Sequence, residues 1–286
     1  MSAVTRAAGD PTVTAREPRL RALAAFYLAT MRAAIQTQLQ YRIANYFYML
    51  GMVAEPVIYL VVWSSIADSS GGTVDGLTAG QLAAYYIVWT LVRNMNIVFG
   101  APFWEFRIRE GQLSGQLLRP LHPLHYDVAY FAGWKIVVIG LWIPIAIVLS
   151  ALFHPDLHPT ALEIAVFCVA IWGAYLVRTM FQSTIGMLNF WTTRGGAMFD
   201  LYMTLELLLS GRLVPLQLMP GWVQTLATFL PFKWTFYFPI ESLVGDMSTR
   251  SLLLGLAAQA LWVGIGLLLF RLAWRSAIKR FSAVGG

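Results

Sequence analysis

The sequence predicts an all-α integral membrane protein with six transmembrane helices and both termini in the cytoplasm. Three observations carry this prediction. Of the 286 residues, 58% are hydrophobic and only 12% are charged, whereas soluble domains have about 25% charged residues. Six apolar segments each approach the roughly 20 residues that a helix needs to cross the ~30 Å hydrocarbon core. Basic residues gather in alternate connections, as the positive-inside rule requires.

The chain begins with a polar tail and an amphipathic segment. Residues 1–18 are small, polar and Pro-containing, which is typical of a disordered tail, and residues 19–286 are expected to form one domain. From Arg19 to Arg42 apolar residues recur at helical spacing: Leu20, Leu23, Tyr27, Met31, Ile35 and Leu39. We expect an amphipathic interfacial helix on the inner membrane surface. An ordinary cytosolic helix packed on protein is the alternative.

Six predicted spans follow. They are Tyr46–Ile66, Leu82–Gly100, Phe131–Phe153, Leu162–Trp191, Ala197–Leu213 and Leu252–Ala273. Arg or Lys residues occupy the N-terminal region, the loop after the second span, the connection between the fourth and fifth spans, and the C-terminus. The intervening loops DSSGGTVDG and HPDLHP contain neither Arg nor Lys. Both termini are therefore predicted to be cytoplasmic.

The region from Gly211 to Asp246 departs from this pattern. Four prolines divide it into apolar pieces that are too short to span: Pro215, Pro220, Pro231 and Pro239. Short apolar pieces between the outward ends of spans five and six predict a re-entrant or interfacial external hairpin.

Four ionisable residues fall within the predicted spans: Glu55, Arg93, Arg178 and Glu206. Such residues are expensive in a membrane unless paired or hydrated. Counting from the span ends places the first three about 10–20 Å deep in the inner half of the membrane. We expect Glu55 to pair with Arg93 or Arg178, or these residues to line a polar cavity. A purely structural ion pair is equally compatible with the sequence. For Glu206, the only evident basic partner is Arg212.

Several function classes are disfavoured. Lysine occurs only at positions 135, 233 and 279, so no phosphate-binding G-x-x-x-x-G-K-[ST] loop can be written. Cys168 is the only cysteine, and the histidines near the loops are better explained as solvated turns than as metal ligands. The net charge of +6 fits membrane orientation and anionic lipid headgroups rather than nucleic acid. No catalytic, cofactor-binding or metal-ligating set is predicted in this chain.

The longest charged interruption is the segment Ala101–Pro123, APFWEFRIREGQLSGQLLRPLHP. It should be a cytoplasmic loop with a short helix, whose Arg and Glu side chains can make charge-assisted contacts with a partner. Gly111 and Gly115 would permit a tight bend. The alternative is a solvated basic loop that only sets the topology.

The order of these features resembles a known family. The loop reads FRIREGQLSGQLLRPLHP after span two, and the external hairpin reads SGRLVPLQLMPGWVQTLATFLPF. The phrases I-R-E-G-x-L, L-L-R-P-L and M-P-x-W with L-P-F resemble permease subunits of ABC-2 type transporters, in the branch with paired permeases and a separate ATPase. The resemblance covers the chain from about Arg19 onward, which would be one ABC-2 type transmembrane domain.

The resemblance implies a transport subunit without its own ATPase site, embedded in the cell membrane and acting as an exporter. Two permease chains, identical or related, would face each other above cytosolic ATPases that bind ATP and Mg. Substrate would pass between the permeases along spans one, two and five. The loop would match the coupling helix that docks on the ATPase, with the interface residues Glu105, Phe106, Arg107, Arg109, Glu110, Gly111 and Leu113.

Two other classes stay open on sequence grounds. An ATP-independent secondary transporter or channel would be favoured by inverted repeats or proton-carrying acids, and no repeat is evident. A membrane-embedded enzyme or scaffold would need a reactive cluster near an interface, and none is visible.

Overall fold

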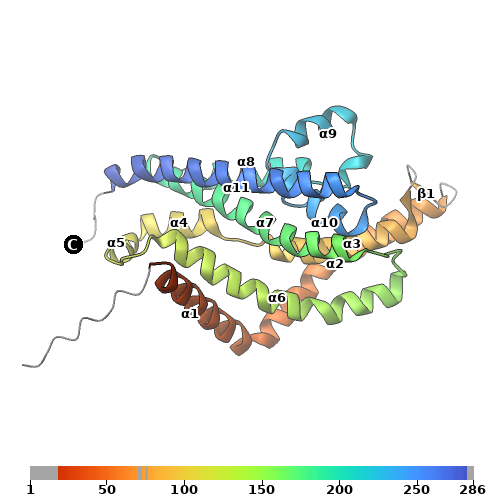
Figure 1. Cartoon of the computed structure of the whole chain (residues 1–286), viewed down its shortest axis with the longest axis horizontal. Coiled ribbons are helices and arrows are strands. Elements are labelled where there is room, and N and C mark those ends of the chain that lie inside the picture. The colour runs from red at the N-terminus through yellow and green to blue at the C-terminus, as the bar shows by residue number, and fades with distance from the viewer. Residues whose placement is uncertain (1–18, 70–72, 75–76, 193, 282–286) are drawn as a thin grey trace, which may run out of the picture.

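The computed structural model describes residues 19–69, 73–74, 77–192 and 194–281. The predicted disordered tail, residues 1–18, lies outside the described residues. The described chain is an elongated bundle of helices with one two-stranded β-pair, β1 (Thr73–Val74) and β2 (Leu77–Thr78), which is antiparallel. Figure 1 shows β1 at the opposite end of the bundle from α5 and the last turns of α11.

The helices are as follows in chain order. They are α1 (Arg19–Gln40), α2 (Arg42–Ser69), α3 (Ala79–Met95), α4 (Gly100–Arg109), α5 (Leu113–Leu117), α6 (Pro123–Phe153), α7 (Ala161–Gly186), α8 (Gly195–Leu209), α9 (Gly221–Thr228), α10 (Tyr237–Val244) and α11 (Thr249–Ala277). Short 3-10 helices accompany them: η1 (Met187–Phe190), η2 (Leu216–Leu218), η3 (Phe232–Trp234) and η4 (Ile278–Arg280).

Within the described residues, five helical segments are long and apolar enough to cross a membrane. They are Arg42–Trp63, Ala79–Arg109, Pro123–Phe153, Ala161–Phe190 and Thr249–Arg280. The predicted fifth span, Ala197–Leu213, is α8, which has only 15 residues. At 1.5 Å per residue it extends about 22 Å, less than the ~30 Å of a hydrocarbon core. Six full spans are therefore not confirmed.

The second span is interrupted, contrary to the continuous helix Leu82–Gly100 that the sequence predicts. α3 ends at Met95 and α4 begins at Gly100. The carbonyls that this break frees are bound by Lys135 Nζ, which donates to Asn94 O at 3.0 Å and to Ile97 O. Lys135 is fully buried, twelve residues into α6. An irregular backbone at membrane depth is stable only when such internal partners exist.

The proline-rich segment between α8 and α11 forms a compact helical hairpin of α9, η3 and α10. The turn after α8 uses Gly211 at φ +80°, a conformation that L side chains rarely adopt. Side chains of α3 bind its carbonyls: Tyr85 OH donates to Gly211 O at 2.8 Å, and Trp89 Nε1 donates to Arg212 O at 2.9 Å. Gln259 Nε2 on α11 donates to Trp234 O at 2.8 Å. These hydrogen bonds thus connect the hairpin to α3 and α11.

Helix α1 packs along α6 through a close backbone approach. A Cβ atom on Gly133 would lie 2.8 Å from Met31 Cα and 2.9 Å from Ala34 Cβ. Tyr27 OH and His125 Nδ1 are 2.9 Å apart. The other face of α1 stays exposed, with Leu20 at 80%. One face on protein and one exposed apolar face are compatible with an interfacial helix.

A pocket of about 180 Å³ lies where β2, α3 and α10 meet. Its lining includes Gln81, Tyr85, Gln217, Glu241 and Asp246. Glu241 is only 8% exposed.

The close approach at Gly133 predicts a test of the α1–α6 contact. Gly133→Val should lower the thermal unfolding temperature in detergent, since overpacking costs about 1–3 kcal/mol. Gly140→Val lies on the same helix, and no other atom lies within 4 Å of a Cβ there. It controls for the helix propensity of valine. Equal losses in the two variants would contradict the contact.

Candidate functional site

Charged side chains from four helices converge at one level of the bundle. They are Glu55 on α2, Arg93 on α3, Arg178 on α7 and Glu206 on α8, joined by Arg212 from the turn after α8. All four ionisable residues predicted inside the spans belong to this cluster. From the sequence, Arg212 was predicted only as a partner for Glu206.

The first pair joins α2 to α3. Arg93 Nη1 lies 2.6 Å from Glu55 Oε2, and the two side chains are 16% and 32% exposed. Tyr59 OH donates to Glu55 Oε1 at 3.2 Å, and the Arg93 guanidinium lies 5.2 Å from the Trp89 ring centroid. The predicted pairing of Glu55 with Arg93 is confirmed. The location of Arg93 in the last turn of α3 is favourable for a cation.

The second pair joins α7 to α8. Arg178 Nη2 lies 2.8 Å from Glu206 Oε2, and Glu206 is fully buried. The expectation that Glu206 has no basic partner except Arg212 is wrong. Arg178 lies twelve residues before the end of η1, and Glu206 lies eleven after the start of α8. These antiparallel segments therefore bring the two residues to the same depth, about 16–18 Å from their connection.

Gln182 holds Arg178 from the next turn of α7. Its amide orientation is assigned from the hydrogen-bond network. In that orientation the nitrogen donates to Val98 O at 2.8 Å, and the oxygen accepts from Arg178 Nε at 3.0 Å. The residue therefore links the break between α3 and α4 to the charged cluster.

Arg212 differs from the other two arginines. None of the ion pairs found among the described residues includes it. Its Nε atom is buried and has no hydrogen-bond partner among the described residues. Two guanidinium groups lie near the Phe236 ring. The guanidinium carbons of Arg178 and Arg212 are 5.8 and 5.9 Å from the ring centroid.

Two cavities adjoin the cluster. The first, here called the arginine cavity, has about 330 Å³ and is lined by Tyr48, Arg93, Ile97, Val98, Phe99, Pro102, Arg178, Gln182, Phe199, Met203 and Arg212. The second, here called the glutamate cavity, has about 410 Å³, is more open, and is lined by Glu55, Tyr59, Asp200, Met203, Thr204, Leu207, Arg212 and Leu213. Met203 and Arg212 line both, so the cavities adjoin along these two residues.

The charged loop after span two forms α4 and α5. Gly111 takes φ +69° directly after α4, so the bend expected at this glycine is present, whereas Gly115 lies within α5. Arg109 Nη2 and Glu105 Oε1 form an i,i+4 pair at 2.9 Å. Phe106 is 53% exposed and Leu118 is 89% exposed. These side chains create a mixed apolar and charged surface at one end of the bundle.

Two of the seven predicted coupling residues have buried side chains. Arg107 is 7% exposed and donates to both carboxylate oxygens of Asp127 on α6, at 2.7 and 2.5 Å. Leu113 is completely buried. Their side chains support the loop from inside, because Arg107 ties α4 to α6. The exposed surface therefore consists of the remaining predicted residues together with Leu118 and Arg119, which are not among the seven predicted ones.

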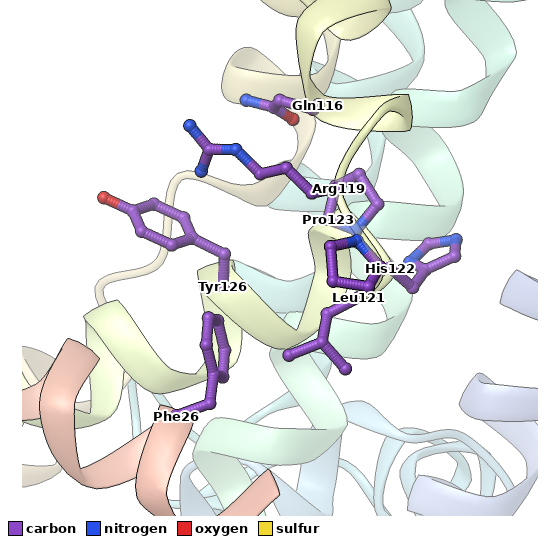
Figure 2. A pocket seen from close by; sticks show the side chains of 8 residues that line it. Phe26, Gln116, Arg119, Leu121, His122, Pro123 and Tyr126 are labelled. Carbon is purple, nitrogen blue, oxygen red and sulfur yellow. The ribbon is translucent and has the colours of Figure 1, made fainter. Parts of the chain in front are cut away.

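A groove of about 330 Å³ lies beside this surface. It is lined by Phe26, Gln116, Arg119, Pro120, Leu121, His122, Pro123 and Tyr126. Figure 2 shows Gln116, Arg119 and the Tyr126 hydroxyl on one side, and Phe26 and Leu121 below them. The side chains come from α1, α5, the α5–α6 connection and the start of α6. The groove has an apolar floor and a single arginine.

Comparison with known protein families resolves the class of the protein. The model of the family described as ABC-2 family transporter protein matches residues 53–285. The chain belongs to this family. A search of curated proteins found no match. The chain is therefore a permease subunit of an ABC transporter and a multi-pass membrane protein. In this family the transmembrane subunits carry no ATPase site of their own and work with a partner ATPase.

Within this permease, the matched region contains every charge of the cluster and the whole of α4 and α5. It excludes α1 and the start of α2. Among the described residues no group of three His, Cys, Asp or Glu side chains could hold a metal ion.

The buried pair between α7 and α8 predicts a non-additive double mutant. Arg178→Met alone leaves the Glu206 carboxylate buried without its cation, which should destabilise the permease by roughly 3–5 kcal/mol. Arg178→Met combined with Glu206→Met should recover most of that loss, because no charge then remains unpaired. Unfolding in detergent measures the coupling. A double variant no more stable than Arg178→Met would show that the two side chains do not act as a pair.

Proposed function

We propose that this ABC-2 permease forms the membrane half of an ATP-driven exporter, in which two permease chains stand above two cytosolic ATPases that bind ATP and Mg. The observation that carries the proposal is the surface of α4 and α5. It presents Phe106, Arg109, Glu110 and Leu118 at one end of the bundle, while a buried ion pair fixes α4 from behind.

The proposed orientation follows the distribution of basic residues. The end that carries α5 and the C-terminal residues faces the cytoplasm, and both termini lie on that side of the cell membrane. α8 and the α9–α10 hairpin together complete a sixth membrane segment, with the hairpin re-entrant from the outside. The support for this arrangement is the short α8 and the binding of the turn carbonyls by α3.

The proposed docking surface suits a protein partner better than solvent. Large apolar side chains such as Phe106 and Leu118 beside a Glu105–Arg109 pair combine an anchor with a charged rim, as protein interfaces do. The groove beside it places Arg119 at the same end. We assign this surface to the ATPase.

The proposed transport path follows the two cavities. They are lined from α2, α3, α7 and α8, and α8 also exposes a row of large apolar residues: Met198, Leu201, Leu205 and Leu208. A second permease, identical or related, would cover this face and enclose the cavities. The alternative, ATP-independent transport, requires no docking surface and is separated from the proposal by the following test.

Truncating the exposed anchors should uncouple the ATPase. In the permease co-expressed with its ATPase, the double variant Phe106→Ala, Leu118→Ala should weaken ATPase binding about tenfold, a loss of ~1.4 kcal/mol. The measurements are the amount of co-purified ATPase and the rate of ATP hydrolysis in the complex.

The matched control is Phe229→Ala, which removes a phenylalanine that is 75% exposed on the α9 side of the hairpin. It should leave ATPase binding intact. Full retention of the ATPase by the double variant, or transport at the full rate without nucleotide, would contradict the proposal.

A further inference from the structure

The arginine cavity has an excess of positive charge. Arg93, Arg178 and Arg212 line it, and none of the described residues in its lining is acidic. The carboxylates of Glu55 and Glu206 neutralise Arg93 and Arg178 from outside that lining. One guanidinium, that of Arg212, therefore has no carboxylate partner among the described residues.

The surroundings of Arg212 fix its position but leave its charge available. Trp89 Nε1 donates to the backbone carbonyl of Arg212 at 2.9 Å, and the backbone N–H of Arg212 donates to Ser210 Oγ at 3.2 Å. The guanidinium lies against the Phe236 ring and reaches the lining of both cavities. A guanidinium presents a rigid fork of donors that matches a carboxylate or a phosphate.

Apart from Tyr48 and Gln182, the rest of the cavity lining is apolar. Ile97, Val98, Phe99, Phe199 and Met203 supply most of its remaining wall. Its volume of about 330 Å³ lies at the lower end of the range for small-molecule sites, which are typically apolar with a few oriented polar groups. A ligand that fits both features carries an anionic head and an apolar body.

We propose that the arginine cavity is a binding site for the anionic group of an amphiphilic substrate, a phosphate or carboxylate attached to an apolar chain, with Arg212 as its principal contact. The proposal rests on the proposed transport function, because it names the class of substrate that the pathway accepts. Arg93 and Arg178, whose charges are neutralised by Glu55 and Glu206, line the same cavity and add guanidinium N–H donors around the anion.

Other classes of ligand fit the lining less well. A cationic amphiphile would enter beside three guanidinium groups and meet no carboxylate in the lining. A neutral sugar would leave the Arg212 charge without a counterion, which is unfavourable away from bulk water. An anion would accept hydrogen bonds from the Arg212 guanidinium and neutralise its positive charge.

Ligand-dependent thermal unfolding of the purified permease in maltoside detergent tests the proposal. The probes are dodecyl phosphate, dodecyltrimethylammonium and inorganic phosphate. Dodecyl phosphate should raise the unfolding temperature in a saturable manner, since a ligand that binds only the folded state stabilises it. The matched cation and inorganic phosphate should not, and stabilisation by inorganic phosphate alone would favour a simple anion site over an amphiphile site.

Arg212→Gln should weaken the apparent affinity for dodecyl phosphate by about tenfold or more. Arg212→Lys keeps the charge without the fork and should give an intermediate affinity, which also guards against a folding defect in the glutamine variant. Arg250→Gln removes an exposed arginine at the start of α11 and should bind like the wild type. Wild-type affinity in Arg212→Gln, or equal stabilisation by the quaternary ammonium, would overturn the proposal.

This assay uses the permease without its ATPase. Failure to bind dodecyl phosphate in a permease that still activates its ATPase would reject the substrate class alone. Binding of dodecyl phosphate by a permease that recruits no ATPase would reject the proposed function alone.

Discussion

The fold depends on one constraint: every polar backbone group at membrane depth needs a partner inside the protein. Two segments leave helical geometry in the middle of the bundle, residues 96–99 and the turn after α8. Lys135 binds Asn94 O just before the first segment and Ile97 O within it, and Tyr85 and Trp89 bind carbonyls of the second. Because an unsatisfied group costs several kcal/mol in hydrocarbon, these bonds fix α3, α6 and the hairpin relative to one another.

The same two interruptions organise the charged cluster. Arg93 precedes the first break, and Arg212 lies in the second. Intact helices would have filled this space with side chains of neighbouring turns, whereas the interrupted ones leave the arginine cavity between them. The pairs Arg93–Glu55 and Arg178–Glu206 then lower the cost of placing charge at this depth. Discontinuous helices beside a midplane site are a common solution in transporters.

The sequence predicted the features that composition and periodicity determine. Apolar length and the position of arginines predict an all-α membrane protein. An isolated acid in span one needs a cation, so the sequence predicts that Glu55 pairs with Arg93 or Arg178, and the structure forms the pair with Arg93. The break after Met95 was not predicted, because the apolar run continues through residues 96–99; its signal is Pro102, which has no N–H to donate to Val98 O and suits the first turn of a new helix. The same holds for the partner of Glu206, since the packing of α7 on α8 decides which of two arginines reaches it.

Arg107 illustrates the limit of reading a charged loop. Its position among Glu105, Arg109 and Glu110 indicates a solvated side chain, yet it points inward to Asp127. An acid near the start of span three gave the only available signal, and which of the loop arginines reaches it depends on the rotation of α4.

Helix α4 connects the two proposed sites physically. Phe99 and Pro102 at its start line the arginine cavity, and Phe106 and Arg109 near its end belong to the docking surface. Its ten residues span about 15 Å. The helix also packs tightly on α7, because a Cβ on Gly186 would lie 2.6 Å from Trp104 Cβ.

Because α4 is short and packs tightly on α7, we expect it to move as a unit. In the proposed transporter, displacement of its exposed end by the ATPase therefore shifts the irregular backbone at residues 96–99. The hydrogen bonds that Lys135 and Gln182 donate to that backbone would change, and the position of the Arg178 side chain would change with them. The interruption of span two is thus the point at which motion outside the membrane can alter the arginine cavity within it.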